Sequence, residues 1–294
     1  MTHKITPHLW FDKEAKEAAE LYTSLFENSK ITNITTLHNT PSGDADIVSF
    51  TLSGQSFMAI SAGPYFKFNP SISFHVKFKT KDDVDEMWKK LSKGGKVLME
   101  LGKYPFSEMY GWIQDKYGLS WQIIYTKEKF THGIVPALMF TQDFTGKARE
   151  AIEYYTKVFP ASKIDVITEY GKNEFNEKED NVMYSQFSLA NEEFIAMDSG
   201  FGHTFKFNEA VSLIVKCKDQ KEIDYYWEKL STVSESEQCG WLKDKYGISW
   251  QIVPTVMDEM MADKDPKRIA RVTEAFLKMK KFDIAKLQEA YESA

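Results

Sequence analysis

Two histidines, His8 and His75, are the residues of this chain whose type and setting best fit chemistry. Each lies in a predicted strand, and the residues two positions away share its side of that strand: Thr6 and Trp10 with His8, Ser73 and Lys77 with His75. A neutral imidazole can bind Zn, Fe, Ni or Mn, and it can equally form a hydrogen bond to a small molecule. The residues therefore leave two interpretations open, a divalent-metal centre or the polar lining of a ligand groove.

A glutamine on the same predicted face belongs to a stretch that occurs twice. Residues 111–123 return almost unchanged as residues 240–252. Both copies predict a hairpin of two short strands around an Asp-Lys-Tyr-Gly turn, in which the Asp accepts backbone N–H groups and the Gly takes a positive φ. We expect Trp112 to pair with Trp121 on the core face, which leaves Gln122 on the opposite face. The duplication shows that the chain is a tandem repeat.

The elements that must position these residues form βαβββ units. The first unit is predicted as a strand, a helix and three strands, at residues 5–11, 13–26, 31–37, 47–52 and 56–60. A second unit follows, with a strand at 72–78, a helix at 82–91 and strands that end in the hairpin. The second half restates this order. The turn aspartates, Asp115 and Asp244, are interpreted as structural residues and not as catalytic acids.

The domain organisation follows from the repeat. We expect an α+β fold with two domains, at residues 1–128 and 132–255, each with a curved mixed sheet. Beyond residue 255 the repeat stops, and residues 256–294 predict a helical extension with an apolar stripe. That stripe packs on the chain's own domains or serves a homodimer.

Composition narrows the class of partner. The net charge is −6 and no basic cluster stands out, which argues against nucleic acid and against an anionic membrane surface. The two cysteines, Cys217 and Cys239, occupy unmatched repeat positions, so neither a disulfide framework nor a thiolate metal site is expected. The start of the chain has no apolar signal-peptide core. We therefore expect a cytoplasmic protein whose partner is a small molecule.

The repeated helix motif and the closing hairpins carry a family resemblance. The motif Ala-x-x-Ala-x-x-x-Tyr-x-x-x-Phe is formed by Ala15, Ala18, Tyr22 and Phe26, and again by Ala148, Ala151, Tyr155 and Phe159. With paired βαβββ units, Gly94-Gly95 and Asp-x-Tyr-Gly-x-x-Trp near the end of each half, the chain resembles the vicinal-oxygen-chelate superfamily. That superfamily comprises glyoxalases, bleomycin-resistance proteins and extradiol dioxygenases, and the closest resemblance is to a tandem member of its PhnB-like branch.

The resemblance implies where a metal would bind. Members with metal hold it on the concave sheet face, through the first strand of each unit and through a closing strand on which Glu is typical. Here Gln122 and Gln251 occupy the closing position, and an amide holds a divalent cation less tightly than a carboxylate does. The implied metal set is His8, His75 and Gln122, all in the first half.

The halves differ in polarity at the matching positions. The second half has Ala137 in place of His8 and Ile214 in place of His75, so we expect one polar and one apolar site. The sequence leaves open whether a groove is built within one half or across halves. The complete expected lining is Thr6, His8, Trp10, Ser73, His75, Lys77, Gln122 and Gln251.

Two functions remain open on this basis. The first is a metal-free protein that binds a small, partly apolar molecule in the concave groove. The second is a divalent-metal enzyme of the lyase, isomerase or dioxygenase type that uses the polar groove of the first half. Methyl transfer finds no support, because no glycine-rich loop between a strand and a helix is present to hold a nucleotide cofactor.

Overall fold

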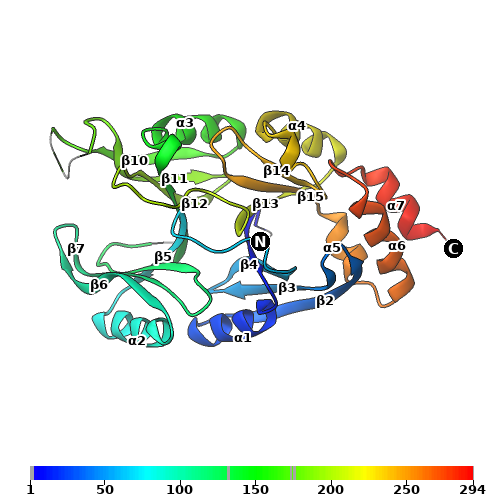
Figure 1. Cartoon of the computed structure of the whole chain (residues 1–294), viewed down its shortest axis with the longest axis horizontal. Helices are drawn as coiled ribbons and strands as arrows, with labels where there is room; N and C mark the ends of the chain where they lie inside the picture. Colours follow the sequence, from blue (N-terminus) through cyan, green and yellow to red (C-terminus); the bar gives the residue numbers. More distant parts are fainter. Residues whose placement is uncertain (1–2, 131–132, 173, 175–176, 294) are drawn as a thin grey trace.

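A computed structural model describes residues 3–130, 133–172, 174 and 177–293 (Figure 1). Residues 131 and 132, where the second half was predicted to begin, lie outside the described residues. The strands of the first half are β1 (Ile5–Phe11), β2 (Lys30–Thr40), β3 (Gly43–Leu52), β4 (Gln55–Ser61), β5 (Ile72–Phe78), β6 (Lys96–Tyr104), β7 (Ser107–Gln114) and β8 (Ser120–Tyr125). Those of the second half are β9 (Ile134–Phe140), β10 (Lys163–Glu169), β11 (Val182–Leu189), β12 (Glu192–Asp198), β13 (Val211–Cys217), β14 (Trp241–Lys243) and β15 (Ser249–Pro254).

The helices follow the predicted order. They are α1 (Ala15–Leu25), α2 (Lys81–Ser92), α3 (Ala148–Val158), α4 (Gln220–Leu230), α5 (Val256–Met261), α6 (Pro266–Leu277) and α7 (Ile284–Glu292), with short 3-10 turns at Gln142–Phe144 and Ser234–Ser236. Side-chain caps fix several starts: Thr80 Oγ1 accepts the N–H of Asp83 at 3.1 Å before α2, and Asp219 accepts that of Glu222 before α4. Such caps contribute about 1 kcal/mol each. Among the described residues, no helix is long and apolar enough to cross a membrane.

The strands form two mixed sheets, and each sheet takes strands from both halves. The seven-stranded sheet has the order β14-β15-β13-β1-β4-β3-β2, and the eight-stranded sheet has the order β10-β11-β12-β9-β5-β8-β7-β6. The halves join through antiparallel pairs, β1 with β13 and β5 with β9. The first unit of one half thus shares a sheet with the second unit of the other half, an arrangement that the sequence left open.

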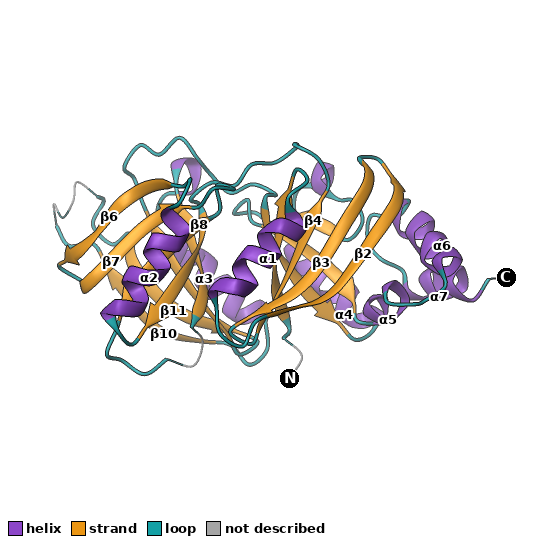
Figure 2. Cartoon of the chain, turned by 90° about the horizontal axis from the view of Figure 1, so that it is seen from below, coloured by secondary structure: helices purple, strands orange, loops and turns teal. Residues whose placement is uncertain are grey.

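The helices α1 to α4 cover one face of each sheet. In Figure 1, α1 and α2 form the lower layer and α3 and α4 the upper layer, and Figure 2 shows α1 across β3 and α2 across β7. Alternate residues of β1, such as Leu9 and Phe11, are buried on the helix side. The opposite side of each sheet is called its helix-free face below, and it carries the predicted site residues.

Each repeat builds its hydrophobic core around its turn aspartate. Asp115 is buried and accepts four hydrogen bonds, from Tyr22 Oη at 2.7 Å, Trp121 Nε1 at 2.9 Å and the N–H groups of Tyr117 and Leu119. The second repeat reproduces this set with Asp244, which accepts bonds from Tyr155, Trp250, Tyr246 and Ile248. The structural role predicted for both aspartates is confirmed, and each also joins the first helix of its half to the closing hairpin.

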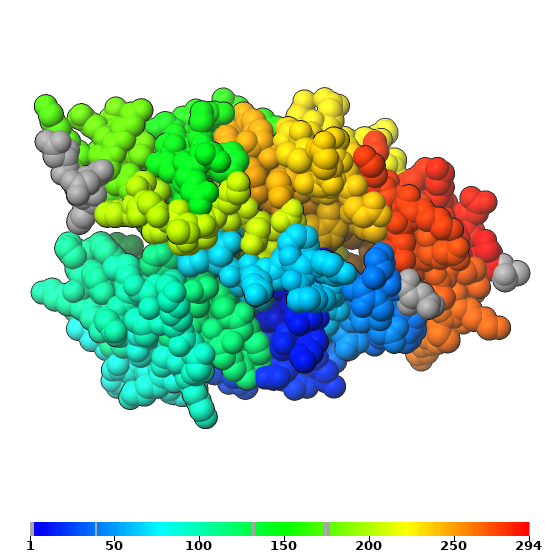
Figure 3. All heavy atoms as spheres, viewed as in Figure 1, coloured from blue at the N-terminus to red at the C-terminus, as the bar shows by residue number. Residues whose placement is uncertain are grey.

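The two halves also meet through the loops that link their units. Asn69 Nδ2 donates to the carbonyl of Lys206 at 3.0 Å, and Asn208 Nδ2 donates reciprocally to the carbonyl of Lys67 at 2.9 Å. Figure 3 shows these loops, sky blue and lime, side by side across the middle of the molecule. The paired bonds reflect the internal two-fold relation of the repeats.

The fourth unit departs from the predicted pattern. Only two strands, β14 and β15, follow α4, because the ten residues 231–240 contain a 3-10 turn where the second unit has β6. The C-terminal extension takes the place of the missing strand: Cys239 N–H donates to the carbonyl of Met279 at 2.8 Å, and Gly240 N–H to that of Lys280 at 2.7 Å. An added Cβ at Gly240 would lie 2.5 Å from the ring of Phe282, so the extension packs closely there.

The extension also reaches the other edge of the seven-stranded sheet. Figure 1 shows α5 and α6 between β15 and β2, and Thr35 Oγ1 on β2 donates to the carbonyl of Met261 at 3.2 Å. The apolar stripe of α6 buries Val272 and Phe276. The extension therefore packs on the chain's own sheet, as one of the two predicted alternatives has it.

Candidate functional site

The helix-free face of the eight-stranded sheet carries a polar row of three hydrogen-bonded side chains. Tyr110 Oη on β7 donates to Gln122 Oε1 on β8 at 2.9 Å, and Gln122 Nε2 donates to Ser73 Oγ on β5 at 2.6 Å. These side chains are buried. These two hydrogen bonds hold the side-chain amide of Gln122 in one orientation and use both of its polar atoms.

His75 lies beside these hydrogen-bonded side chains and differs from them. Its register partner on β8 is Gln122, and its side chain is 7% exposed. Among the described residues, its Nδ1 atom has no hydrogen-bond partner. Burial, helped by the charge of Lys77, lowers the pKa of His75 to about 3, so the ring is neutral at pH 7. A buried polar atom without a hydrogen-bond partner costs folding free energy.

The charge of Lys77 is compensated on this face. Its Nζ lies 3.4 Å from Glu193 on β12, and both side chains are mostly buried. The surroundings of His75 therefore offer hydrogen bonding without a free lysine charge.

Apolar residues complete the face on the β9 side. Val135, Ala137 and Ile195 form a buried cluster separate from the main core, and Tyr184 and Met197 pack against it. The strand register places Ala137 opposite Ser73 and Val135 opposite His75. A polar strip from the first half thus adjoins an apolar strip from the second half.

The helix-free face of the seven-stranded sheet holds His8 in a different setting. Gln251 Nε2 donates to Ser212 Oγ at 2.9 Å, and that oxygen lies 3.5 Å from His8 Nδ1. Burial lowers the pKa of His8 to about 3. The ring of Trp241 packs edge-on against His8 with the centroids 5.4 Å apart.

Other predicted site residues on this face also have partners within the chain. Trp10 packs against Trp241 at 6.0 Å and donates its Nε1–H to the carbonyl of Gly63 at 2.8 Å. Thr6 is buried opposite Ile214. Lys216 on β13 pairs with Asp258 of α5, so the C-terminal extension contacts this face.

The predicted metal set does not come together. His8 lies on β1 of the seven-stranded sheet, whereas His75 and Gln122 lie on β5 and β8 of the eight-stranded sheet. The expectation of one convergent set is therefore wrong, because the two units of the first half contribute to different sheets. The expected contrast between one polar and one apolar half is corrected for the same reason, since each face receives one histidine and one closing glutamine.

The residues present also fit a divalent cation poorly. Beside His75, both polar atoms of Gln122 are already bonded to Tyr110 and Ser73. In the part of the chain that the structure describes, no group of three His, Cys, Asp or Glu side chains could hold a metal ion. Divalent metals bind through several such ligands, so we assign no metal to either face.

The predicted register of the hairpin is one residue off. The turn closes with Asp115 N–H donating to the carbonyl of Leu119 at 2.9 Å, so Gln114 faces Ser120 across a five-residue loop. Trp112 therefore lies opposite Gln122 on the helix-free face, and only Trp121 is in the core. The register error also misplaces Tyr110. This residue lies two positions before Trp112 and shares its face, so the correct register places Tyr110 on the helix-free face as well.

A carboxylate that could have served a ligand has a structural role. Asp198, the counterpart of Ser61, is buried at the end of β12 and accepts the N–H groups of Gly146, Ala148 and Val182. Ser61 Oγ accepts the corresponding N–H of Ala15 in the first half at 3.1 Å. Both residues tie the end of a strand to the start of the helix of their unit.

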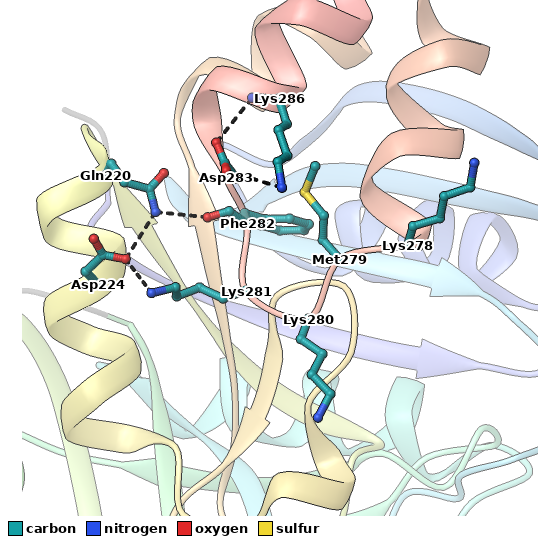
Figure 4. Close-up of a pocket in the computed structure, with 9 residues that line it drawn as sticks. All are labelled: Gln220, Asp224, Lys278, Met279, Lys280, Lys281, Phe282, Asp283 and Lys286. Atoms are coloured by element: carbon teal, nitrogen blue, oxygen red, sulfur yellow. Dashed lines mark hydrogen bonds and ion pairs between the residues drawn. The ribbon is translucent and has the colours of Figure 1, made fainter.

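A surface hollow of about 560 Å³ lies between α4 and the C-terminal extension (Figure 4). Its four lysines each have a carboxylate partner: Lys278 with Glu274, Lys280 with Glu237, Lys281 with Asp224 and Lys286 with Asp283. Gln220 bridges the two parts, donating to the carbonyl of Phe282 and accepting the N–H of Ile284, both at 3.0 Å. The hollow is the joint that anchors the extension.

Two mixed sheets built from repeated βαβ-type units, with helices on one face of each, define a tandem vicinal-oxygen-chelate fold. The family model described as 3-demethylubiquinone-9 3-methyltransferase matches residues 3–124 and again residues 132–253. The chain therefore belongs to this PhnB-like family and contains two copies of its unit.

The chain is also similar to solved structures. A Bacillus cereus protein described as a 3-demethylubiquinone-9 3-methyltransferase and PhnB protein is 41% identical, and the match covers 42% of this chain and 100% of that one with a TM-score of 0.40. A glyoxalase I mutant from Zea mays is 11% identical over 87% of this chain and 95% of its own, with a TM-score of 0.53, which shows a shared fold. The search of curated proteins gave no match.

Proposed function

We propose that this protein binds a small, partly apolar molecule at His75, on the helix-free face of the eight-stranded sheet. The observation that carries the proposal is the buried Nδ1 atom of His75, which lacks a hydrogen-bond partner among the described residues. Most buried polar atoms in proteins are satisfied, so this one marks a place where a partner supplied by a ligand lowers the free energy.

The surroundings of His75 support a ligand with one polar and one apolar part. The bonded row of Tyr110, Gln122 and Ser73 fixes the polar side, and the cluster around Ala137 and Ile195 supplies the apolar side. Ligand sites commonly combine a few oriented polar groups with an apolar lining. The seven-stranded sheet is the weaker candidate, because there His8 contacts Ser212 and Trp241.

The same residues favour binding over metal-assisted catalysis or methyl transfer. A Lewis-acid reaction would need ligands that the face of His75 does not assemble. The methyl transfer named in the family description would need a site for a methyl donor, and both sheets are mixed and not doubly wound parallel sheets with a glycine-rich loop.

A thermal-shift screen tests this function. The full chain is screened against neutral compounds of fewer than about 20 non-hydrogen atoms, since a compound that binds the folded protein raises its Tm. Compounds that stabilise the native protein are expected to stabilise His8→Ala equally and His75→Ala much less. His8 is a matched control, because it is also a buried histidine with a pKa of about 3 on the helix-free face of the other sheet.

The screen is repeated after treatment with a chelator and after supplying Zn, Fe, Ni or Mn. We expect the shifts to be unchanged. Shifts that vanish with chelator and return with one metal, or shifts equally large in His75→Ala, would overturn the proposed function.

A further inference from the structure

The two helix-free faces place the same tryptophan of the repeat differently. On the eight-stranded sheet, Trp112 donates its Nε1–H to Ser120 Oγ at 2.8 Å. The repeat matches this pair with Trp241 and Ser249, but Ser249 Oγ is buried and has no partner in the described part of the chain. Trp241 lies instead over His8, with the two rings at 88°. The bond that holds Trp112 in place is missing in the second copy.

Trp241 belongs to a group of rings that exists on one face only. It lies 6.0 Å from Trp10, whose ring also packs against Phe66 at 5.0 Å. On the eight-stranded sheet, the positions equivalent to His8 and Trp10 are Ala137 and Met139. That face therefore lacks the rings of His8 and Trp10, and the ring of Trp112, which does lie on it, is bonded to Ser120.

The eight-stranded sheet instead offers a hydrogen-bonding ring at another position. His75 stands where the other sheet has Ile214, and its Nδ1 is unsatisfied. Aromatic side chains extend from the polar row: Phe106 is 63% exposed and packs edge-on against Tyr110 with the ring centroids 5.0 Å apart. Edge-on ring pairs are favourable beyond the area that they bury.

We propose that the ligand of the eight-stranded sheet is a planar aromatic molecule of about the size of indole, bearing one neutral N–H or O–H group that binds His75. On the other sheet, the indole of Trp241 takes the place that we assign to this molecule. This inference rests on the proposed function and narrows its ligand class. A charged head group is disfavoured, because Lys77 is already paired with Glu193 and His75 is neutral.

The experiment is isothermal titration calorimetry of the full chain with indole and, for comparison, with 1-adamantanol. Both are neutral, apolar and able to donate one hydrogen bond, but only indole is planar. We expect indole to bind one site per chain and 1-adamantanol to bind at least tenfold more weakly. His75→Ala should weaken indole about tenfold, the effect of losing one hydrogen bond.

Two further variants test where on the molecule indole binds. Ala137→His copies the residue of the other sheet, and we expect it to weaken indole binding by at least tenfold, while His8→Ala leaves binding unchanged. The Tm of each variant without ligand shows that it is folded. If Ala137→His lowers the Tm strongly, Met139→Trp, which copies Trp10, replaces it in the test.

The outcomes separate this inference from the proposed function. Equal binding of 1-adamantanol and indole, both weakened by His75→Ala, would overturn the planar ligand and leave the proposed function standing. Indole binding that His75→Ala does not change would overturn the inference, as would no binding of indole at all. The function itself fails if the compounds of the screen act independently of His75 or act only with an added metal.

Discussion

Asp244→Asn is expected to lower the free energy of unfolding by about 3 kcal/mol, because it breaks a buried group of the second repeat that accepts four hydrogen bonds. Asp244 accepts two N–H groups of its own turn, the Oη–H of Tyr155 and the Nε1–H of Trp250. An amide presents one acceptor and two donors, so its NH2 group would face donors that need an acceptor. Burial raises the pKa of Asp244 to about 6, so the native carboxylate is ionised at pH 7 and its four donors compensate the charge.

Urea unfolding at pH 7 measures this effect. The matched variant is Asp115→Asn, which removes the equivalent group of the first repeat and should cost a similar amount. Lys245→Ala serves as the control in the same turn, since its ion pair with Glu150 is half-exposed and such pairs contribute less than about 1 kcal/mol. Wild-type stability in either Asn variant would show that the aspartate does not hold the first helix of its half to the closing hairpin.

Acidification from pH 7 to pH 5 is expected to cost about 2 kcal/mol of stability for each buried histidine. Burial lowers the pKa of His8 and of His75 to about 3, whereas the unfolded chain has a pKa near 6.5. Between these values the unfolded state binds the proton and the native state does not, so stability falls as the pH falls through 6.5. The loss continues until the pH reaches about 3.

The measurement compares His8→Gln and His75→Gln with the native protein by urea unfolding at pH 7, 6 and 5. Each variant should lose about 2 kcal/mol less between pH 7 and pH 5 than the native protein does. The raised pKa of Asp244 contributes with the opposite sign, but it is common to all three proteins and cancels in the comparison. An unchanged pH dependence in both variants would mean that these imidazoles titrate normally in the folded protein.

The local structure was largely predictable from residue spacing. The strand at residues 5–11 is observed with those bounds, and the helix predicted at 82–91 is observed at Lys81–Ser92. Alternation also placed His8 and His75 correctly on the faces opposite Leu9 and Phe74, because a strand must direct alternate side chains to opposite sides. These features depend on neighbouring residues alone, which is why the sequence contains them.

The assembly of the site was not predictable in the same way. Alternation says which side of a strand His75 occupies, but not that β5 pairs with β9 of the other repeat. That choice depends on long-range packing, and it separates His8 from His75. The one-residue error at Trp112 had a local cause, since the turn closes through Asp115 and Leu119 as a loop of five residues instead of four.

Histidine NMR shows directly which of the two buried histidines a ligand contacts. The chain contains six histidines, and the ring nitrogens of His75 can be identified by their absence in His75→Ala. When the most stabilising compound of the screen is added to 15N-histidine-labelled protein, we expect a large change in the ring-nitrogen shifts of His75 and little change at His8. Changed shifts at His8 with those of His75 unaffected would overturn the proposed function, because they would place the ligand on the seven-stranded sheet.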